Sequence, residues 1–423
     1  MKQTVKWMRL DNAAKIFPAI IRRNWNNVFR VSASLTEAVD PAVLQAALEA
    51  VLPRFPSMAV RLRRGVFWYY LEELPDPPRI RPEGSYPLVQ MSWKELKTCC
   101  LRVLYRQNRI AVEFFHALTD GTGGMVFLKT LTAAYLSRKY GLVIPAGRGV
   151  LPLDQPPQPQ ELEDSFQRCA APVPLSRKET NAYHYRGEAL PEGFRALTTG
   201  LVSTSALRAM ARSYGVTVTS FLSGVMLQTL MELQAASGRR PKEVKVTIPV
   251  NLRRLYGSQT LRNFVLTVNP GVDPRMGQYD LKELCQAVHH QLAAEVTPQR
   301  MAGRIAANVL PEQNRVLRAC PLFLKNLAMR QVYRSVGERK GSINISNLGL
   351  QALPEAMEAY VTRLDFVIGV QLSYSNNCSV ASYGDVTTLN LIRSIRQSEL
   401  ERRFFTHLVE LGLPVTVESN QPR

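Results

Sequence analysis

The sequence predicts an α/β protein of two domains, on three observations. The chain has 423 residues, and because domains usually span roughly 100–200 residues, two domains are expected. Strand patterns alternate with helix patterns along both halves of the chain. Residues 145–191, between the halves, are rich in proline and polar residues, which is typical of a linker or surface crossover. We therefore divide the chain into an N-terminal lobe, residues 1–175, and a C-terminal lobe, residues 176–423.

The N-terminal lobe begins its regular structure with a strand and a capped helix. Val28–Leu35 has a strand pattern, and Asp40 is placed to cap a helix over Pro41–Leu52, with proline at its first position. Two hairpins follow, because apolar residues alternate on both sides of short polar turns. The hairpins and the long helix after them are predicted over residues 59–71, 99–115 and 125–140.

The C-terminal lobe repeats this alternation without a residue-level repeat. Its predicted strands span residues 201–203, 244–250, 343–345, 365–375 and 386–392. Its predicted helices span residues 204–213, 219–237, 280–295 and 398–411.

The chain is strongly basic. Its 53 Lys and Arg against 34 Asp and Glu give a net charge of +19, which attracts polyanions. Because the basic pairs are scattered and no zinc-finger or RNP-type pattern occurs, we do not expect nucleic acid as the primary ligand. A ligand with several phosphates, or an acidic carrier protein, suits this charge at least as well.

The sequence predicts neither a membrane span nor secretion. No apolar run reaches the roughly 20 residues needed to cross a bilayer, and polar residues interrupt Thr219–Ala236, which is typical of a buried helix. The N-terminus has no continuous apolar core and no cleavage site of a signal peptide. We therefore expect a cytoplasmic monomer without a transmembrane segment.

His116 is the candidate residue for chemistry. It ends a predicted strand and is followed by Asp120 and Gly121, where a rigid strand end opens into a glycine-rich turn. Three interpretations are open. A metal site would need further ligands, and no other histidine is well placed. A structural role would make Asp120 the cap of the next helix. In the third, neutral imidazole takes a proton from a hydroxyl or amine that attacks an activated acyl group.

Residues 114–124, FFHALTDGTGG, resemble the H-H-x-x-x-D-G motif of the condensation-domain and chloramphenicol acetyltransferase-like acyltransferase superfamily. Residues 248–254 (IPVNLRR), followed by 262–265 (RNFV), are similar to its P-V-x-x-R … N-F pattern. Residues 345–349 (ISNLG) look like the S-N-x-G segment of the alcohol acetyltransferase-like and wax-ester-synthase-like branches. The opening WMRLDNAAKIFPAI resembles the first segment of the alcohol acetyltransferase-like branch, so the resemblance covers nearly the whole chain.

Two departures from the family pattern matter. Phe115 replaces the first histidine of the doubled motif, although the second histidine is the base in the superfamily. The D-F-G-W-G segment of the plant enzymes is absent, and Leu364–Gly369 is at most a distant echo of it, which argues against that branch.

The resemblance implies an α/β fold of two chloramphenicol acetyltransferase-like lobes, each a mixed β-sheet flanked by helices, with an active-site tunnel between them. It implies transfer of an acyl group from acyl-CoA, a co-substrate and not a permanently bound cofactor, to a small-molecule or lipid alcohol or amine. His116 is then the general base. Asp120 is implied to point away from the imidazole and to pair with Arg253 across the lobes.

The remaining implied site residues shape the tunnel. Gly121 would permit a tight turn behind Asp120. Ser346 and Asn347 would line the tunnel, and no residue is expected to bind a metal ion. A condensation-type enzyme that takes its donor from an acyl carrier protein would use the same chemistry. A non-catalytic binding module of the same fold is the alternative that Phe115 keeps open.

Overall fold

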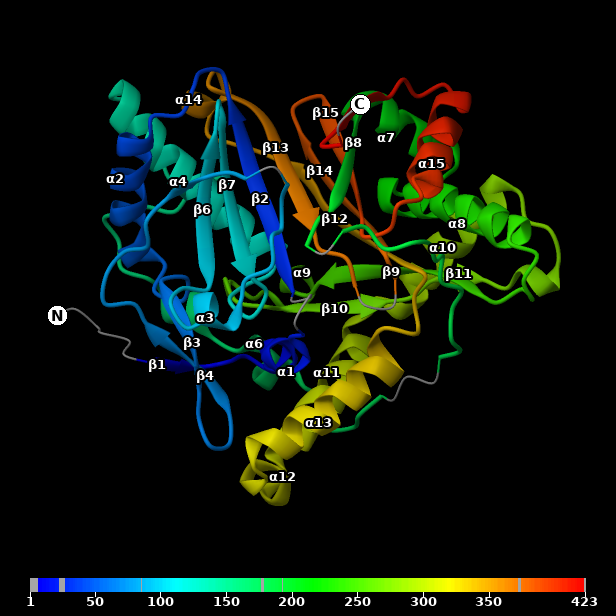
Figure 1. The fold of residues 1–423 in the computed structure, drawn as a ribbon, viewed down its shortest axis with the longest axis horizontal. Coiled ribbons are helices and arrows are strands. Elements are labelled where there is room, and N and C mark those ends of the chain that lie inside the picture. Colours follow the sequence, from blue (N-terminus) through cyan, green and yellow to red (C-terminus); the bar gives the residue numbers. More distant parts are fainter. Residues whose placement is uncertain are drawn as a thin grey trace.

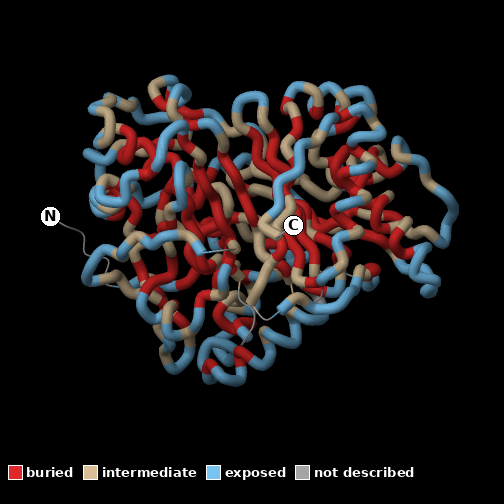
Figure 2. Tube along the Cα trace, turned by 45° about the horizontal axis from the view of Figure 1, so that its top comes forward, coloured by how far each residue is buried: buried red, intermediate tan, exposed pale blue. Residues whose placement is uncertain are grey.

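A computed structural model of the chain describes residues 7–22, 27–84, 86–175, 179–191, 193–371 and 374–421. Two mixed α/β lobes lie side by side, and strands of their sheets meet at the centre of the molecule (Figure 1). Each lobe has its own apolar core, and buried chain runs through the interior of both lobes in Figure 2.

The first lobe is built on a five-stranded sheet. Its strand order is β13–β2–β7–β6–β5, with the bounds Val361–Ile368, Val28–Leu35, Arg109–Phe115, Leu101–Arg106 and Arg81–Pro82. Helix α4 (Gly121–Tyr140) packs on β2 and β7, and α2 (Pro41–Val51) packs beside α4. As predicted, Asp40 caps α2, since its carboxylate accepts hydrogen bonds from the first turn.

A small sheet flanks this lobe, with the order β1 (Trp7–Arg9), β4 (Tyr69–Glu73) and β3 (Val60–Arg64). Strands β3 and β4 form the first predicted hairpin, and β6 and β7 form the second. Short helices α1 (Ile16–Ile20) and α3 (Trp93–Leu96) complete the lobe.

The second lobe is built on an eight-stranded sheet. The order β10–β9–β12–β14–β15–β8–β16 has the bounds Val265–Val268, Val244–Asn251, Ile343–Gln351, Asn376–Tyr383, Val386–Arg393, Ala196–Ser203 and Thr416–Ser419, and β11 (Gly271–Val272) pairs with β9. Strand β12 runs parallel to both neighbours, whereas the other pairs are antiparallel. The packed helices are α7 (Thr204–Ser213), α8 (Val218–Ala236), α10 (Leu281–Glu295) and α15 (Glu399–Glu410).

Strand β13 crosses from the second half of the chain into the first sheet. It runs antiparallel to β2, with Phe366 opposite Val31, and it also contacts β14 and β15. The strand predicted over residues 365–375 therefore begins earlier, ends at Ile368, and belongs to the first sheet; residues 372–373 lie outside the described ranges. The first sheet thus includes a strand from beyond the division that we placed at residue 175.

The proline-rich crossover is more structured than predicted. It carries two short helices, α5 (Pro159–Leu162) and α6 (Ser165–Cys169). Glu161 is buried and forms a bidentate pair with Arg54, with N–O distances of 2.6 and 2.7 Å. The crossover is therefore not a surface linker throughout, because this pair anchors it to the first lobe.

Helices α11 (Pro298–Gln313), α12 (Arg315–Ala319) and α13 (Leu322–Val332) lie in a stretch for which the sequence patterns predicted no element. Within the described ranges, no single helix is long and apolar enough to cross a bilayer. Helices α7 and α8 meet that criterion together, but they are bent by 76° relative to each other, and α8 is largely buried in the second core.

Candidate active site

His116 follows the last residue of β7 and faces a cavity between the lobes. Its N–H donates to the carbonyl oxygen of Asn27 at 2.9 Å, which holds the chain as it leaves the sheet. The imidazole stacks on Phe17, with 4.6 Å between ring centroids, and meets the edge of Phe29 at 5.0 Å. The half-buried ring lines a cavity of about 560 Å³ with residues of both lobes.

The neighbouring Phe115 points the other way. Its side chain is fully buried in the core of the first lobe, because successive residues of a strand face opposite sides of the sheet. The residue that replaces the first histidine of the motif therefore packs in the core and leaves the cavity to His116.

Asn263 determines which nitrogen of His116 carries the proton. The Asn263 amide nitrogen donates to the carbonyl oxygen of His116 at 3.0 Å and to Oδ2 of Asp11 at 3.3 Å. These two acceptors orient the amide so that its Oδ1 lies 3.0 Å from Nδ1 of His116. Because an amide oxygen only accepts, Nδ1 must donate, and Nε2 keeps its lone pair. No described residue forms a hydrogen bond with Nε2.

Asp11 helps to hold the Asn263 amide in this orientation. It is fully buried, accepts a hydrogen bond from the N–H of Ala14 at 2.7 Å, and lies 3.7 Å from the guanidinium of Arg262. Burial raises the pKa of Asp11 to about 6, against the opposing charge of Arg262. Asp11 and Asn263 lie in the family-like segments WMRLDNAAKIFPAI and RNFV, but neither was predicted as a site residue. For Asn263, the available signal was the two-residue N-F match.

Burial lowers the pKa of His116 below its ordinary value of 6.5, because the enclosed imidazolium loses hydration. Asp120 and Asn263 oppose this shift without reversing it. The imidazole is therefore neutral near neutral pH, which is the form that can accept a proton.

Asp120 caps helix α4 and joins the lobes. One carboxylate oxygen accepts hydrogen bonds from the N–H groups of Thr122 and Gly123. The other lies 2.8 Å from Nη1 of Arg253 and accepts from the N–H of Phe264 at 2.9 Å. Both of these partners belong to the second lobe. The carboxylate therefore has partners on both oxygens, and it holds the loop after His116 against the second lobe.

Arg253 is held at the start of α9 (Arg253–Tyr256) by further acceptors. Its Nε donates to the carbonyl oxygen of Thr260 at 2.7 Å and its Nη2 to that of Arg262 at 2.5 Å. The guanidinium thus has partners on several sides, and Asp120 supplies the opposite charge.

Gly121 serves close packing and not a tight turn. It is the first residue of α4 and is not among the glycines with positive φ, so the turn expected there is wrong. A Cβ at this position would lie 2.8 Å from Cδ2 of Leu348 and 3.0 Å from Cζ of Phe366. Glycine is needed because these two residues, which also line the cavity, approach the helix this closely.

Ser346 and Asn347 of β12 line the same cavity as His116. Asn347 donates to the hydroxyl of Thr219 at 3.1 Å, and its own Oδ1 accepts from the N–H of Gly349 at 2.7 Å. Arg254 also lines the cavity and is exposed to solvent.

Within the described ranges, no three His, Cys, Asp or Glu side chains gather so as to hold a metal ion.

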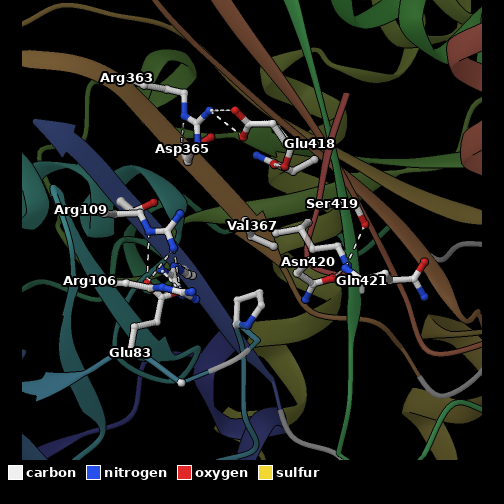
Figure 3. Close-up of a pocket in the computed structure, with 17 residues that line it drawn as sticks. Glu83, Arg106, Arg109, Arg363, Asp365, Val367, Glu418, Ser419, Asn420 and Gln421 are labelled. Carbon is white, nitrogen blue, oxygen red and sulfur yellow. Dashed lines mark hydrogen bonds and ion pairs between the residues drawn. The ribbon is translucent and has the colours of Figure 1, made fainter. Parts of the chain in front are cut away.

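A second cavity between the lobes, of about 820 Å³, lies on the other face of β13 (Figure 3). Phe366 lines the His116 cavity, whereas its neighbour Asp365 lines this one, as alternation along a strand requires. Arg363 lies 2.9 Å from both Asp365 and Glu418 of β16. The Arg363–Glu418 ion pair connects the two sheets, because β13 and β16 belong to different sheets.

No protein-family model and no curated protein matches the sequence. Similar solved structures include the polyketide synthase associated protein 5 from Mycobacterium tuberculosis, at 15% identity, covering 95% of this chain and 96% of that one, with a TM-score of 0.59. The TRI3 trichothecene 15-O-acetyltransferase from Fusarium sporotrichioides matches at 12% identity, with 96% and 94% covered and a TM-score of 0.62. The first condensation domain of the CDA synthetase matches at 13% identity, with 96% of each chain covered and a TM-score of 0.59. These likenesses confirm the predicted fold class.

Proposed function

Because the chain has the fold of condensation domains and of a trichothecene acetyltransferase, we propose that it is an acyltransferase with His116 as general base. The acyl group comes from the thioester of acyl-CoA and goes to an alcohol or amine. One observation carries the proposal: Asn263 holds His116 in the tautomer whose Nε2 is unprotonated, and the ring lines a cavity between the lobes.

The proposed reaction needs one proton carrier. As the acceptor oxygen or nitrogen attacks the thioester carbonyl carbon, Nε2 of His116 takes its proton. The tetrahedral intermediate then collapses, the carbon–sulfur bond breaks, and the imidazolium returns the proton to the leaving thiolate. Asn263 keeps the ring oriented throughout, and general base assistance of this kind contributes roughly 10²–10⁴-fold. Asp120 takes no proton, because Arg253, Phe264 and the first turn of α4 occupy its oxygens.

A phosphate-bearing donor fits the electrostatics. The chain carries a net charge of +19, and Arg254 places an exposed cation on the lining of the His116 cavity. Among solved structures of the same fold, the starter condensation domain of rhizomide synthetase is described in complex with C8-CoA, and TRI101 from F. sporotrichioides with coenzyme A and T-2. The match to TRI101 is at 11% identity and a TM-score of 0.62.

The test is incubation of the full chain with a panel of acyl-CoAs and of alcohol and amine acceptors, with free thiol release as the readout. We expect acceptor-dependent release that His116→Ala abolishes, while thermal unfolding of the variant stays close to that of the wild type. Turnover by His116→Ala near the wild-type rate contradicts the mechanism. If free thiol is released from an acylated carrier protein but from none of the acyl-CoAs, the donor is a carrier protein, as in condensation-type enzymes.

A further inference from the structure

Helix α13 turns polar side chains toward the protein. Lys325 and Asn326 are both buried, and Nζ of Lys325 donates to the carbonyl oxygen of Phe67 at 3.1 Å. The N–H of Leu322 donates to the carbonyl oxygen of Val66 at 3.0 Å. The start of α13 and the tip of the β3–β4 hairpin are therefore one connected unit.

The opposite face of α13 is apolar and exposed. Phe323, Leu324 and Leu327 have exposed fractions of 62%, 45% and 68%. A helix that faces water normally buries such residues and exposes its lysines, so α13 is oriented in the reverse sense. Large exposed apolar side chains next to it are Val66, Phe67, Val316 and Leu317. We call these seven residues the docking surface; α12, α13 and the hairpin project from one side of the molecule (Figure 1).

The charge on α12 and α13 has one sign. Residues 313–337 contain no Asp or Glu. The exposed cations next to the apolar side chains are Arg64, Arg315, Arg318, Arg330 and Arg334. Within the described part of the chain, no ion pair joins these arginines to an acidic side chain, whereas ion pairs are frequent elsewhere in the molecule.

We propose that the docking surface binds an anionic lipid membrane at its interface. Exposed Phe and Leu next to several arginines are the combination that inserts into the headgroup region and attracts anionic lipids. The apolar side chains stand on a projecting helix and a hairpin tip, a shape suited to insertion into a bilayer and not to capture of a ligand.

A cavity of about 970 Å³ opens beside the docking surface. Trp68 of the hairpin and Arg318 of α12 line it, together with Arg262. Arg262 precedes Asn263, the residue that orients His116. Membrane docking would place this cavity, whose lining reaches the residue before Asn263, at the lipid surface. That a lipid from the membrane is the acceptor rests on the proposed function, whereas docking itself does not.

The experiment is flotation of the full chain with vesicles of phosphatidylcholine and phosphatidylglycerol, without any acyl donor. We expect the wild type to float and salt to weaken its binding. Phe323→Gln combined with Leu327→Gln is expected to lower the partition coefficient by roughly tenfold or more, since two large apolar side chains no longer leave water. The matched control is Val409→Gln on α15, whose exposed fraction of 53% is similar; it should float like the wild type.

A second pair of variants tests the charge. Arg315→Gln with Arg334→Gln should weaken binding to the anionic vesicles and leave the weaker binding to pure phosphatidylcholine unchanged. The control is Arg240→Gln, which removes an exposed arginine outside the docking surface and should change neither binding. Circular dichroism melting verifies that each variant is folded.

Three results overturn the proposal: no flotation of the wild type at low salt, equal losses for the Phe323/Leu327 and Val409 variants, or a vesicle-free dimer in sedimentation velocity that Phe323→Gln with Leu327→Gln converts to a monomer. The last result would make a second copy of the chain the occupant of this surface.

Discussion

Asn263 of the second lobe accepts a hydrogen bond at 3.0 Å from Nδ1 of His116, which belongs to the first lobe. The proposed base is therefore oriented by a residue of the other lobe, 147 positions away. Any separation of the lobes would free the imidazole to adopt either tautomer, so the contact links lobe closure to competence for proton transfer.

Asn263→Ala should lower kcat and change KM little, because the ring loses its orienting partner but the cavity keeps its shape. The loss in kcat should be at least about tenfold. It should not exceed the contribution of general base catalysis as a whole, which is roughly 10²–10⁴-fold. Asn263→Asp separates positioning from packing: a carboxylate next to Nδ1 raises the pKa of His116, so the acid limb of the pH profile should move upward. Wild-type kcat in Asn263→Ala contradicts the positioning role.

The acid limb of kcat/KM should lie below pH 6.5. Burial lowers the pKa of His116, so the imidazole of the free enzyme stays unprotonated, and therefore able to accept a proton, to a lower pH than an exposed histidine would. Activity is lost only when the pH falls through this lowered pKa. A pH series of initial rates with acyl-CoA below KM measures it, and an acid limb at or above pH 6.5 would contradict the assignment.

Asp120→Ala should destabilise the protein by about 3–5 kcal/mol, because the Arg253 guanidinium, only 10% exposed, would lose its opposite charge. Asp120→Asn should cost less, since an amide oxygen can still cap α4. Urea unfolding measures the free energy of unfolding, which should be highest for the wild type, lower for Asp120→Asn and lowest for Asp120→Ala. If stability is unchanged and added base restores lost activity, Asp120 is instead a direct participant in catalysis.

Salt should raise the KM for acyl-CoA, because exposed charges are screened beyond roughly 8–10 Å at physiological ionic strength. Arg254→Ala should raise the same KM severalfold and flatten its salt dependence, while Arg240→Ala serves as a charge-matched control. Initial rates from low to high salt provide the measurement. A KM that does not vary with salt in the wild type would mean that the basic surface has another purpose.

Neither half of the chain should be active alone. Residues 1–175 carry His116 and Asp120, whereas Arg253, Asn263, Ser346 and Asn347 come from residues 185–423. The first fragment also lacks β13 and so leaves β2 as an unpaired sheet edge, which favours aggregation. Each fragment is expressed and assayed for thiol release; full activity of the first fragment alone would rule out a site between the lobes.

Much of the local structure was predictable from the sequence, because caps, alternation and turns depend on residues a few positions apart. The strand Val28–Leu35 and the helix Thr204–Ser213 have the predicted bounds. The segment after His116 also indicated chemistry without tertiary information, since a histidine between a strand end and an Asp-Gly turn is held rigidly and exposed. Residues 298–332 gave no such pattern, and there the apolar face of α13 points outward.

By itself, the sequence determined the two-lobed α/β class, the capped elements and the candidate base His116. The tertiary structure alone decided that β13 joins the first sheet, that Gly121 is required by Leu348 and Phe366, and that Asn263 selects the tautomer of His116. These contacts join residues more than a hundred positions apart, and their formation depends on how two sheets pack against each other. No periodicity within one segment encodes that packing, so these features appear only once the chain is folded.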